Sequence, residues 1–163
     1  GAVLFAKTSK AAARLTEQMR TGDFEKRYLA VLGGVPEPES GKLVNWLKKN
    51  AVNNMVYLST EGTDGAKYAA LDYRVLEKKG GLSLTEIKLH TGRSHQIRVQ
   101  FASRDHALLG DRKYGAGEQD GCRIALWSYK LSFLHPQSGQ PIAFSAPPPA
   151  VFPWNLFNLS ELS

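Results

Sequence analysis

The sequence has 163 residues, of which 42% are hydrophobic and 22% are charged, and this composition favours one soluble globular domain with a hydrophobic core. It carries 21 Lys and Arg against 15 Asp and Glu, and the net charge of +6 favours contact with polyanions such as nucleic acids. Its one cysteine, Cys122, excludes an internal disulfide, and its apolar runs are too short to cross a bilayer, so a cytoplasmic location is the default expectation.

The first third of the chain predicts a strand, a helix and a second strand. Residues 3–6 form an apolar run that indicates the end of a buried strand. Thr8 or Ser9 is expected to cap a helix over residues 10–19, and Gly22 is expected to end it. Residues 24–32 are rich in aromatic and β-favouring types, so they predict a strand. On that strand Lys26 and Tyr28 would point to the same face, since side chains alternate.

The middle of the chain predicts an antiparallel sheet. Residues 35–40 mark a loop, residues 55–58, 68–76 and 82–90 are strand-like, and Gly80 and Gly81 lie in a hairpin connection. Four lysines in this region are candidates for contacts with RNA phosphates, or equally form a solvated basic face: Lys42, Lys48, Lys49 and Lys67.

The most informative stretch is residues 86–102, where a strand meets a turn and a helix follows. Ser94 is the expected N-cap of this helix, because its hydroxyl can accept from a free N–H group of the first turn. Ser94 and Arg98 would share one helix face, and Ile97 would form an apolar pair with Phe101.

Three motifs resemble those of one enzyme family, the RluA-type RNA pseudouridine synthases. Residues 91–99 read Thr-Gly-Arg-Ser-His-Gln-Ile-Arg-Val and are similar to the signature of that family. Residues 109–115, Leu-Gly-Asp-Arg-Lys-Tyr-Gly, resemble its Gly-Asp-x-x-Tyr-Gly element, and residues 26–33, Lys-Arg-Tyr-Leu-Ala-Val-Leu-Gly, resemble its Lys-x-Tyr-x-Ala block. The resemblance extends over residues 1–149, and its three motifs occur in the family's order.

The resemblance implies an α+β fold, with a mixed, mostly antiparallel sheet and flanking helices around a central cleft. It implies a single catalytic domain over residues 1–163 that isomerises uridine to pseudouridine in ribosomal or transfer RNA. The reaction is an isomerisation, so no cofactor and no metal are expected. RNA is the expected partner.

The resemblance also implies roles for individual residues. Residues 1–8 look like the end of a further motif whose Asp is the catalytic residue, so that Asp is expected a few residues before Gly1. Arg98 is expected to pair with it, because a guanidinium stays protonated and lowers the pKa of a carboxyl beside it. Tyr28 is expected to stack on the target uracil and to take part in proton removal, and Ile97 to pack against the base.

The other candidate residues have more general roles. Arg93 and Lys26 are read as phosphate contacts, together with Lys42 and Lys48. Asp111 and Tyr114 would either shape the rim of the pocket or form a structural turn, and His95 is read as a structural hydrogen-bonding residue. Since the catalytic Asp lies outside residues 1–163, the alternative is an RNA-binding module without catalytic activity.

Overall fold

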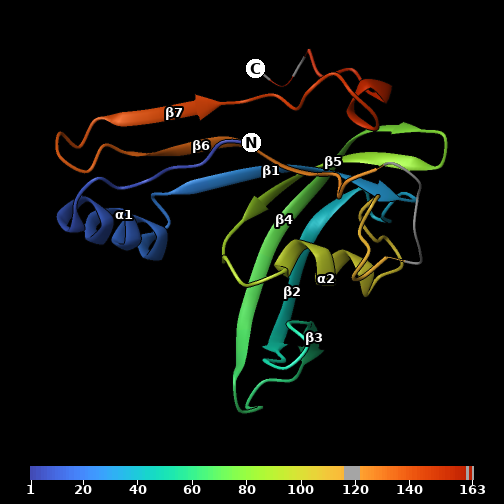
Figure 1. Cartoon of the computed structure of the whole chain (residues 1–163), viewed down its shortest axis with the longest axis horizontal. Helices are drawn as coiled ribbons and strands as arrows, with labels where there is room; N and C mark the ends of the chain where they lie inside the picture. Colours follow the sequence, from blue (N-terminus) through green and yellow to red (C-terminus); the bar gives the residue numbers. More distant parts are fainter. Residues whose placement is uncertain (116–121, 161, 163) are drawn as a thin grey trace.

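The computed structural model describes residues 1–115, 122–160 and 162. Seven strands form one sheet in the order β3-β2-β4-β5-β1-β6-β7, and every strand pairing in the described residues is antiparallel (Figure 1). The elements in chain order are α1 (Ser9–Thr21), β1 (Glu25–Gly33), β2 (Ser40–Lys49), β3 (Val56–Ser59), β4 (Ala66–Lys79), β5 (Leu82–Leu89), α2 (Gln96–Ala102), β6 (Leu126–Leu134), β7 (Pro141–Ser145) and the 3-10 helix η1 (Trp154–Leu156).

Both α-helices lie on one face of the sheet, which we call the helix face. In α1, Leu15 is buried in a cluster with Phe24, Leu131 and Phe133, beside β1 and β6. α2 packs its apolar residues against the middle of the sheet, where the cluster contains Ala30, Leu71, Ile87, Ile97 and Phe101. Figure 1 shows α1 and α2 well separated along the sheet.

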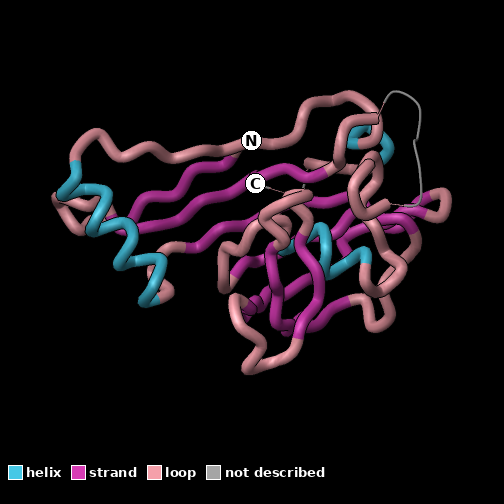
Figure 2. Tube along the Cα trace, turned by 60° about the horizontal axis from the view of Figure 1, so that its bottom comes forward, coloured by secondary structure: helices cyan, strands magenta, loops and turns pink. Residues whose placement is uncertain are grey.

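The opposite face of the sheet is covered at one end by the C-terminal segment. Trp154 and Phe157 are buried there against Leu29, Val31 and Leu84 of β1 and β5. Since Leu29 and Val31 alternate with Tyr28 and Ala30 along β1, the two hydrophobic clusters lie on opposite faces of the same strand. Figure 2 shows how the strands separate these two layers.

The structure confirms the α+β fold class and most of the predicted elements. Thr8 is the N-cap of α1, since its side chain accepts from Ala11 N at 3.2 Å, and Gly22 ends the helix with a φ of 91°. The predicted strand at residues 24–32 corresponds to β1, and the predicted strands at residues 55–58, 68–76 and 82–90 correspond to β3, β4 and β5, whereas β2 is not among the predicted strands.

Two local predictions are wrong. Residues 3–6 form no strand, and Val3 and Phe5 are 70% and 84% exposed. Ala2 N donates to the carbonyl oxygen of Ser128 on β6, but residues 3–6 do not continue this pairing, and the segment packs on the cluster around Leu15 through Ala2 and Leu4 instead. Ser94 is not the N-cap of α2 either: the helix begins at Gln96, and His95 holds the N-cap position with a φ of 51°.

Candidate functional site

A cavity of about 450 Å³ opens on the helix face between α1 and the turn before α2. Lys26 from β1 and Arg93 from the turn both line it, so the structure brings these two predicted phosphate contacts together. The Lys26 ammonium lies 3.5 Å from the Met19 sulfur and 5.3 Å from the centre of the Phe24 ring. Burial lowers the pKa of Lys26, and in the described part of the chain no carboxylate pairs with it. A half-buried cation without a counterion favours an anionic ligand.

Tyr28 follows Lys26 on the same face of β1 and packs against the cluster that contains Ile97. The structure therefore places both predicted base contacts, one from β1 and one from α2, at one hydrophobic cluster. Burial raises the pKa of the Tyr28 phenol, and a hydrogen bond with Ser128 opposes part of this rise. The phenol is therefore protonated at neutral pH, as suits a platform for a base.

The first residues of the chain lie close to Tyr28. Ala2 N donates a hydrogen bond of 2.7 Å to the carbonyl oxygen of Ser128. Ser128 is the residue of β6 that pairs with Tyr28 of β1. Gly1 thus lies one strand away from Tyr28.

Arg98 forms a bidentate ion pair with Asp111. Its Nε and Nη2 donate to the two carboxylate oxygens of Asp111 at 2.8 and 2.6 Å. The Asp111 side chain is fully buried, whereas the Arg98 side chain is 20% exposed. Burial alone would raise the pKa of Asp111, but the hydrogen bonds from Arg98 and from two backbone N–H groups outweigh it and hold the pKa below its usual value. Asp111 therefore carries a charge that compensates most of the charge of Arg98.

The segment that contains Asp111 is anchored to α2 and to β3. Oδ1 of Asp111 also accepts from the N–H groups of Lys113 and Tyr114, at 3.0 and 3.1 Å, which is an Asx-type turn. The ring of Tyr114 lies 5.1 Å from the guanidinium carbon of Arg98. Its hydroxyl accepts from Val56 N at 2.8 Å and lies 2.8 Å from Nδ1 of His95.

This network bears on three residues whose roles the sequence left general. Asp111 and Tyr114 contact Arg98 and form a turn that orients its guanidinium. His95 joins the same network: its pKa is lowered, mainly by burial and then by the positive charges of Arg98 and Lys113, so a neutral imidazole can accept from the Tyr114 hydroxyl.

Sequence reasoning missed the residues that hold the turn before α2. Gln96 is 2% exposed, and its Oε1 accepts from Thr91 Oγ1 at 2.7 Å and from Arg93 N at 3.0 Å. Its Nε2 donates to the carbonyl oxygen of Ala70 on β4, at 3.0 Å, and Ala70 N donates to Thr91 Oγ1 at 2.9 Å. A polar residue at a helix position with apolar neighbours, Gln96 before Ile97, is the signal that could have identified it.

Two of the other predicted RNA contacts, Lys42 and Lys48, lie away from this cleft. Leu43 and Leu47 of β2 belong to clusters beside α2, on the helix face. Because side chains alternate along a strand, Lys42 and Lys48 point to the opposite face. Lys49 and Lys67 instead line a smaller cavity together with Arg93, beside the turn before α2. The structure thus divides the six predicted phosphate contacts between two faces.

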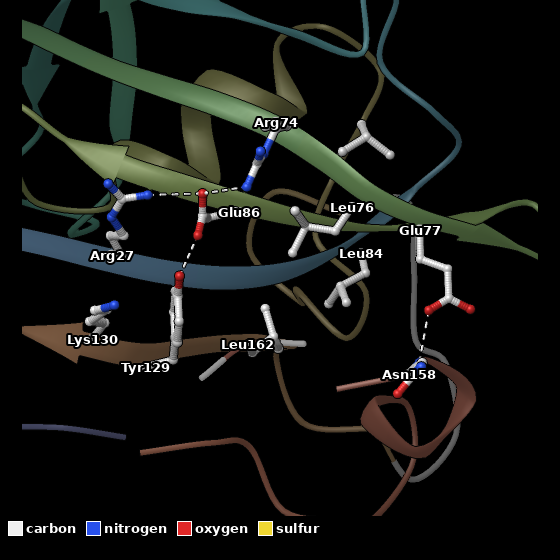
Figure 3. A pocket seen from close by; sticks show the side chains of 11 residues that line it. Arg27, Arg74, Leu76, Glu77, Leu84, Glu86, Tyr129, Lys130, Asn158 and Leu162 are labelled. Atoms are coloured by element: carbon white, nitrogen blue, oxygen red, sulfur yellow. Dashed lines mark hydrogen bonds and ion pairs between the residues drawn. The ribbon is translucent and has the colours of Figure 1, made fainter. Parts of the chain in front are cut away.

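A second cavity, of about 850 Å³, lies on the opposite face beside the C-terminal segment (Figure 3). Glu86 stands at its centre, accepts from the Tyr129 hydroxyl, and pairs with Arg27 at 3.1 Å and Arg74 at 3.5 Å. Burial, together with the hydrogen bond to Glu86 and its negative charge, raises the pKa of Tyr129 far above its usual value. These interactions use both oxygens of Glu86, so this carboxylate has the environment of a structural ion pair.

Among the described residues, no group of three or more His, Cys, Asp or Glu side chains is placed to hold a metal ion. No described helix is both long enough and apolar enough to cross a membrane.

Comparison with known proteins identifies the family. The model of the family described as RNA pseudouridylate synthase matches residues 1–103. The chain belongs to this family. The match includes Lys26, Tyr28, Arg93, Ile97 and Arg98. Lys26 and Arg93 line the cavity between α1 and the turn before α2, and Tyr28 packs beside Ile97 at the neighbouring cluster, so this region is the candidate active site.

Individual relatives carry the same family name. An uncharacterized RNA pseudouridine synthase of Chlorobaculum parvum is 35% identical over an alignment that covers 91% of this chain and 51% of that protein. A ribosomal large subunit pseudouridine synthase D of Neisseria meningitidis is 34% identical, over 91% of this chain and 42% of that protein. The chain therefore spans about half the length, or less, of these pseudouridine synthases.

Solved structures share the fold. The human RNA pseudouridylate synthase domain containing 1 matches with a TM-score of 0.72 and 25% identity, over 90% of this chain and 63% of that one. The human RNA pseudouridylate synthase domain containing 4 matches with a TM-score of 0.74 at 20% identity, over 91% of this chain and 67% of that one, a likeness that concerns the fold alone. The antiparallel sheet with its helix-face cleft is thus the pseudouridine synthase fold.

Proposed function

We propose that the full-length protein isomerises uridine to pseudouridine in RNA, and that its substrate is ribosomal RNA. One observation carries the proposal: Lys26, a half-buried cation without a carboxylate partner, lines one cavity with Arg93, and Tyr28, the next residue on the same face of β1, packs against the cluster that contains Ile97. A uridine in folded RNA must leave its stack to react, so the pocket needs phosphate contacts, an aromatic platform and an apolar wall. The choice of ribosomal RNA rests on the printed name of the Neisseria relative, and transfer RNA is the second candidate substrate.

The reaction assigns a task to each residue. The bond between C1′ of the ribose and N1 of uracil breaks, the base turns, a bond forms between C1′ and C5, and the proton on C5 moves to N1. In our proposal, an Asp from a segment before Gly1 acts at the ribose, and Arg98 keeps it ionised. That segment would enter beside Ser128, one strand away from Tyr28.

Tyr28 has two candidate roles in this scheme. As a platform it would stack on the uracil through its ring. As a proton acceptor it would first have to lose its own proton, and its raised pKa makes that loss harder at neutral pH. We therefore propose the platform as its main role.

The proposal is tested with the full-length protein and RNA from cells that lack its gene. Digestion to nucleosides followed by mass spectrometry should show new pseudouridine after incubation, and sequencing of the modified sites should place it in ribosomal RNA. RNA that stays unmodified under conditions where the protein binds it would overturn the proposal and favour an RNA-binding module without activity. We propose a cytoplasmic location, and fractionation of cells with detection of the protein tests it.

A further inference from the structure

The opposite face of β2, β3 and β4 carries a row of aromatic and basic side chains, which we call the aromatic-basic face. Trp46 pairs with Tyr68 in the register of β2 and β4, and Lys48 pairs with Tyr57 in the register of β2 and β3. Lys42 and Val44 precede Trp46 on the same face of β2. The neighbours Leu47, Val56 and Ala69 are buried on the helix face with Val99 of α2, which confirms the direction of the alternation.

This part of the sheet is open to solvent. Val44, Tyr57 and Tyr68 are 45%, 46% and 42% exposed, which is unusual for residues in the middle of paired strands. Both α-helices pack on the helix face, and the C-terminal segment packs further along the sheet, on β1 and β5. Figure 1 shows the ends of β2 and β4, with β3, extending away from the rest of the protein. In the described residues no element covers this face.

The chemistry of the face fits one class of ligand. The rings of Trp46 and Tyr68 lie 5.8 Å apart at 74°, an edge-to-face pair beside which further flat rings can stack. Lys42 and Lys48 are exposed, and the described residues give neither of them a carboxylate partner. The nearby carboxylate of Asp72 is bound to His90 at 2.6 Å. Aromatic rings with cations among them are how proteins bind unpaired nucleotides without reading their sequence.

We propose that the aromatic-basic face binds single-stranded RNA, with bases stacked on Trp46, Tyr57 and Tyr68 and phosphates held by Lys42 and Lys48. The inference rests on the proposed function in taking the polyanion to be RNA. The two lysines are six positions apart along β2, a span of about 20 Å at about 3.4 Å per residue. The ligand is therefore a segment of several nucleotides, and not a single base.

The position of the face suggests how it serves the reaction. β3 is the edge strand at this end of the sheet, so RNA can pass around it from one face to the other. The RNA segment that flanks the target uridine would leave the cleft on the helix face and continue over the aromatic-basic face. A protein partner is the weaker fit, because lysines are depleted from the cores of protein interfaces.

The first test measures binding of the full-length protein to a fluorescein-labelled oligoadenylate of 12 nucleotides by fluorescence anisotropy. Trp46→Ala and Tyr68→Ala should each weaken binding by about fivefold or more, since each removes a stacking ring, whereas Trp46→Phe and Tyr68→Phe should keep most of the affinity. The matched control is Phe152→Ala, which removes an aromatic ring that is 52% exposed on the C-terminal segment and should leave binding unchanged. Thermal melting of each variant checks that it folds.

The lysines are tested through the salt dependence of the same binding. The double variant Lys42→Gln and Lys48→Gln should reduce the slope of log K against log salt by about 1.4, or about 0.7 for each phosphate contact to a single strand. An unchanged slope, or wild-type affinity in both alanine variants of Trp46 and Tyr68, would overturn the inference.

Hydroxyl-radical footprinting separates RNA from other occupants. In the full-length protein without RNA, Tyr57 and Tyr68 should be oxidised readily, and the oligoadenylate should protect them. Protection already present without RNA would mean that another part of the protein or a second copy covers the face, which would overturn the inference. Because oligoadenylate contains no uridine, these results do not depend on isomerisation. If the protein isomerises uridine but its affinity for oligoadenylate is unchanged by Trp46→Ala, only this inference is refuted and the proposed function stands.

Discussion

Asp111 holds one edge of the Arg98 guanidinium, with hydrogen bonds of 2.8 Å from Nε and 2.6 Å from Nη2. In the described residues Nη1 of Arg98 makes no hydrogen bond, so it is the group that remains for another carboxylate. The family resemblance implies that the arginine pairs with the catalytic Asp. The geometry is compatible with a shared arginine, held by Asp111 on one edge and free to meet a second carboxylate at Nη1.

Replacing Asp111 by Asn should destabilise the protein by about 2 to 3 kcal/mol at neutral pH, because it leaves the partly buried charge of Arg98 without its counterion. The folded-state pKa of Asp111 is depressed, so this contribution is present above its unfolded value near 3.8 and is lost as the pH falls through the folded value. Urea unfolding at several pH values checks both points. The wild-type and Asp111→Asn curves should converge in acid, whereas equal stability at pH 7 would show that the ion pair contributes little.

A control for this experiment is Asp72→Asn. Asp72 pairs with His90 at 2.6 Å, but the two side chains are 46% and 36% exposed. Solvent screens such a pair, so this change should cost less than about 1 kcal/mol.

Replacing Arg98 by Lys should abolish most of the activity of the full-length protein while RNA affinity changes little. The charge is kept, but an ammonium cannot hold Asp111 with two parallel bonds and meet a second carboxylate at the same time. We expect the rate of pseudouridine formation to fall by about a hundredfold or more, as when one preorganised donor is removed. Single-turnover assays with saturating enzyme measure this rate.

The matched control for Arg98 is Arg74→Lys. Arg74 also pairs with a carboxylate, Glu86, but its side chain is 65% exposed and lies on the opposite face of the sheet. Its replacement should leave the rate near that of the wild type. Normal turnover in Arg98→Lys would remove Arg98 from the candidate catalytic residues.

Replacing Tyr28 by Phe separates its two candidate roles. The ring is kept and the hydroxyl is lost, so a platform would work almost as before and a proton acceptor would fail. Since burial raises the pKa of this phenol, we expect the rate to fall by less than about tenfold. A loss of a hundredfold or more, with RNA affinity unchanged, would assign the hydroxyl a role in proton transfer.

Replacing Lys26 by Gln should weaken RNA binding. It should also reduce the slope of log K against log salt by the amount expected for the loss of about one phosphate contact. The pKa of Lys26 is lowered by burial, so its contribution should decline as the pH rises, and at a lower pH than for an ordinary lysine. Binding titrations between pH 7 and pH 10 measure this. Lys10→Gln, in the exposed first turn of α1, is the control and should show neither effect.

The sequence alone determined the fold class and the main elements. Helix α1 follows from local signals, since Thr8 caps it and Gly22 ends it in a left-handed conformation that glycine adopts at little cost. The alternation along β1 correctly placed Lys26 and Tyr28 on one face, because side chains of a strand alternate whatever the rest of the fold does. The motifs at residues 26–33, 91–99 and 109–115 together resemble one family, and the family model matches residues 1–103.

Only the tertiary structure decided which residues act together. Arg98 and Asp111 are thirteen positions apart, and no local pattern specifies their contact. Val3 and Phe5 look apolar enough for a buried strand, yet they are exposed, because Ala2 and Leu4 pack on the cluster around Leu15 and the side chains between and after them face away from it. Lys42, Lys48, Lys26 and Arg93 all contribute to the positive net charge, but Lys26 and Arg93 lie on the helix face of the sheet and Lys42 and Lys48 on the opposite face. Composition counts charges, whereas strand register and the side on which the helices pack determine where those charges point.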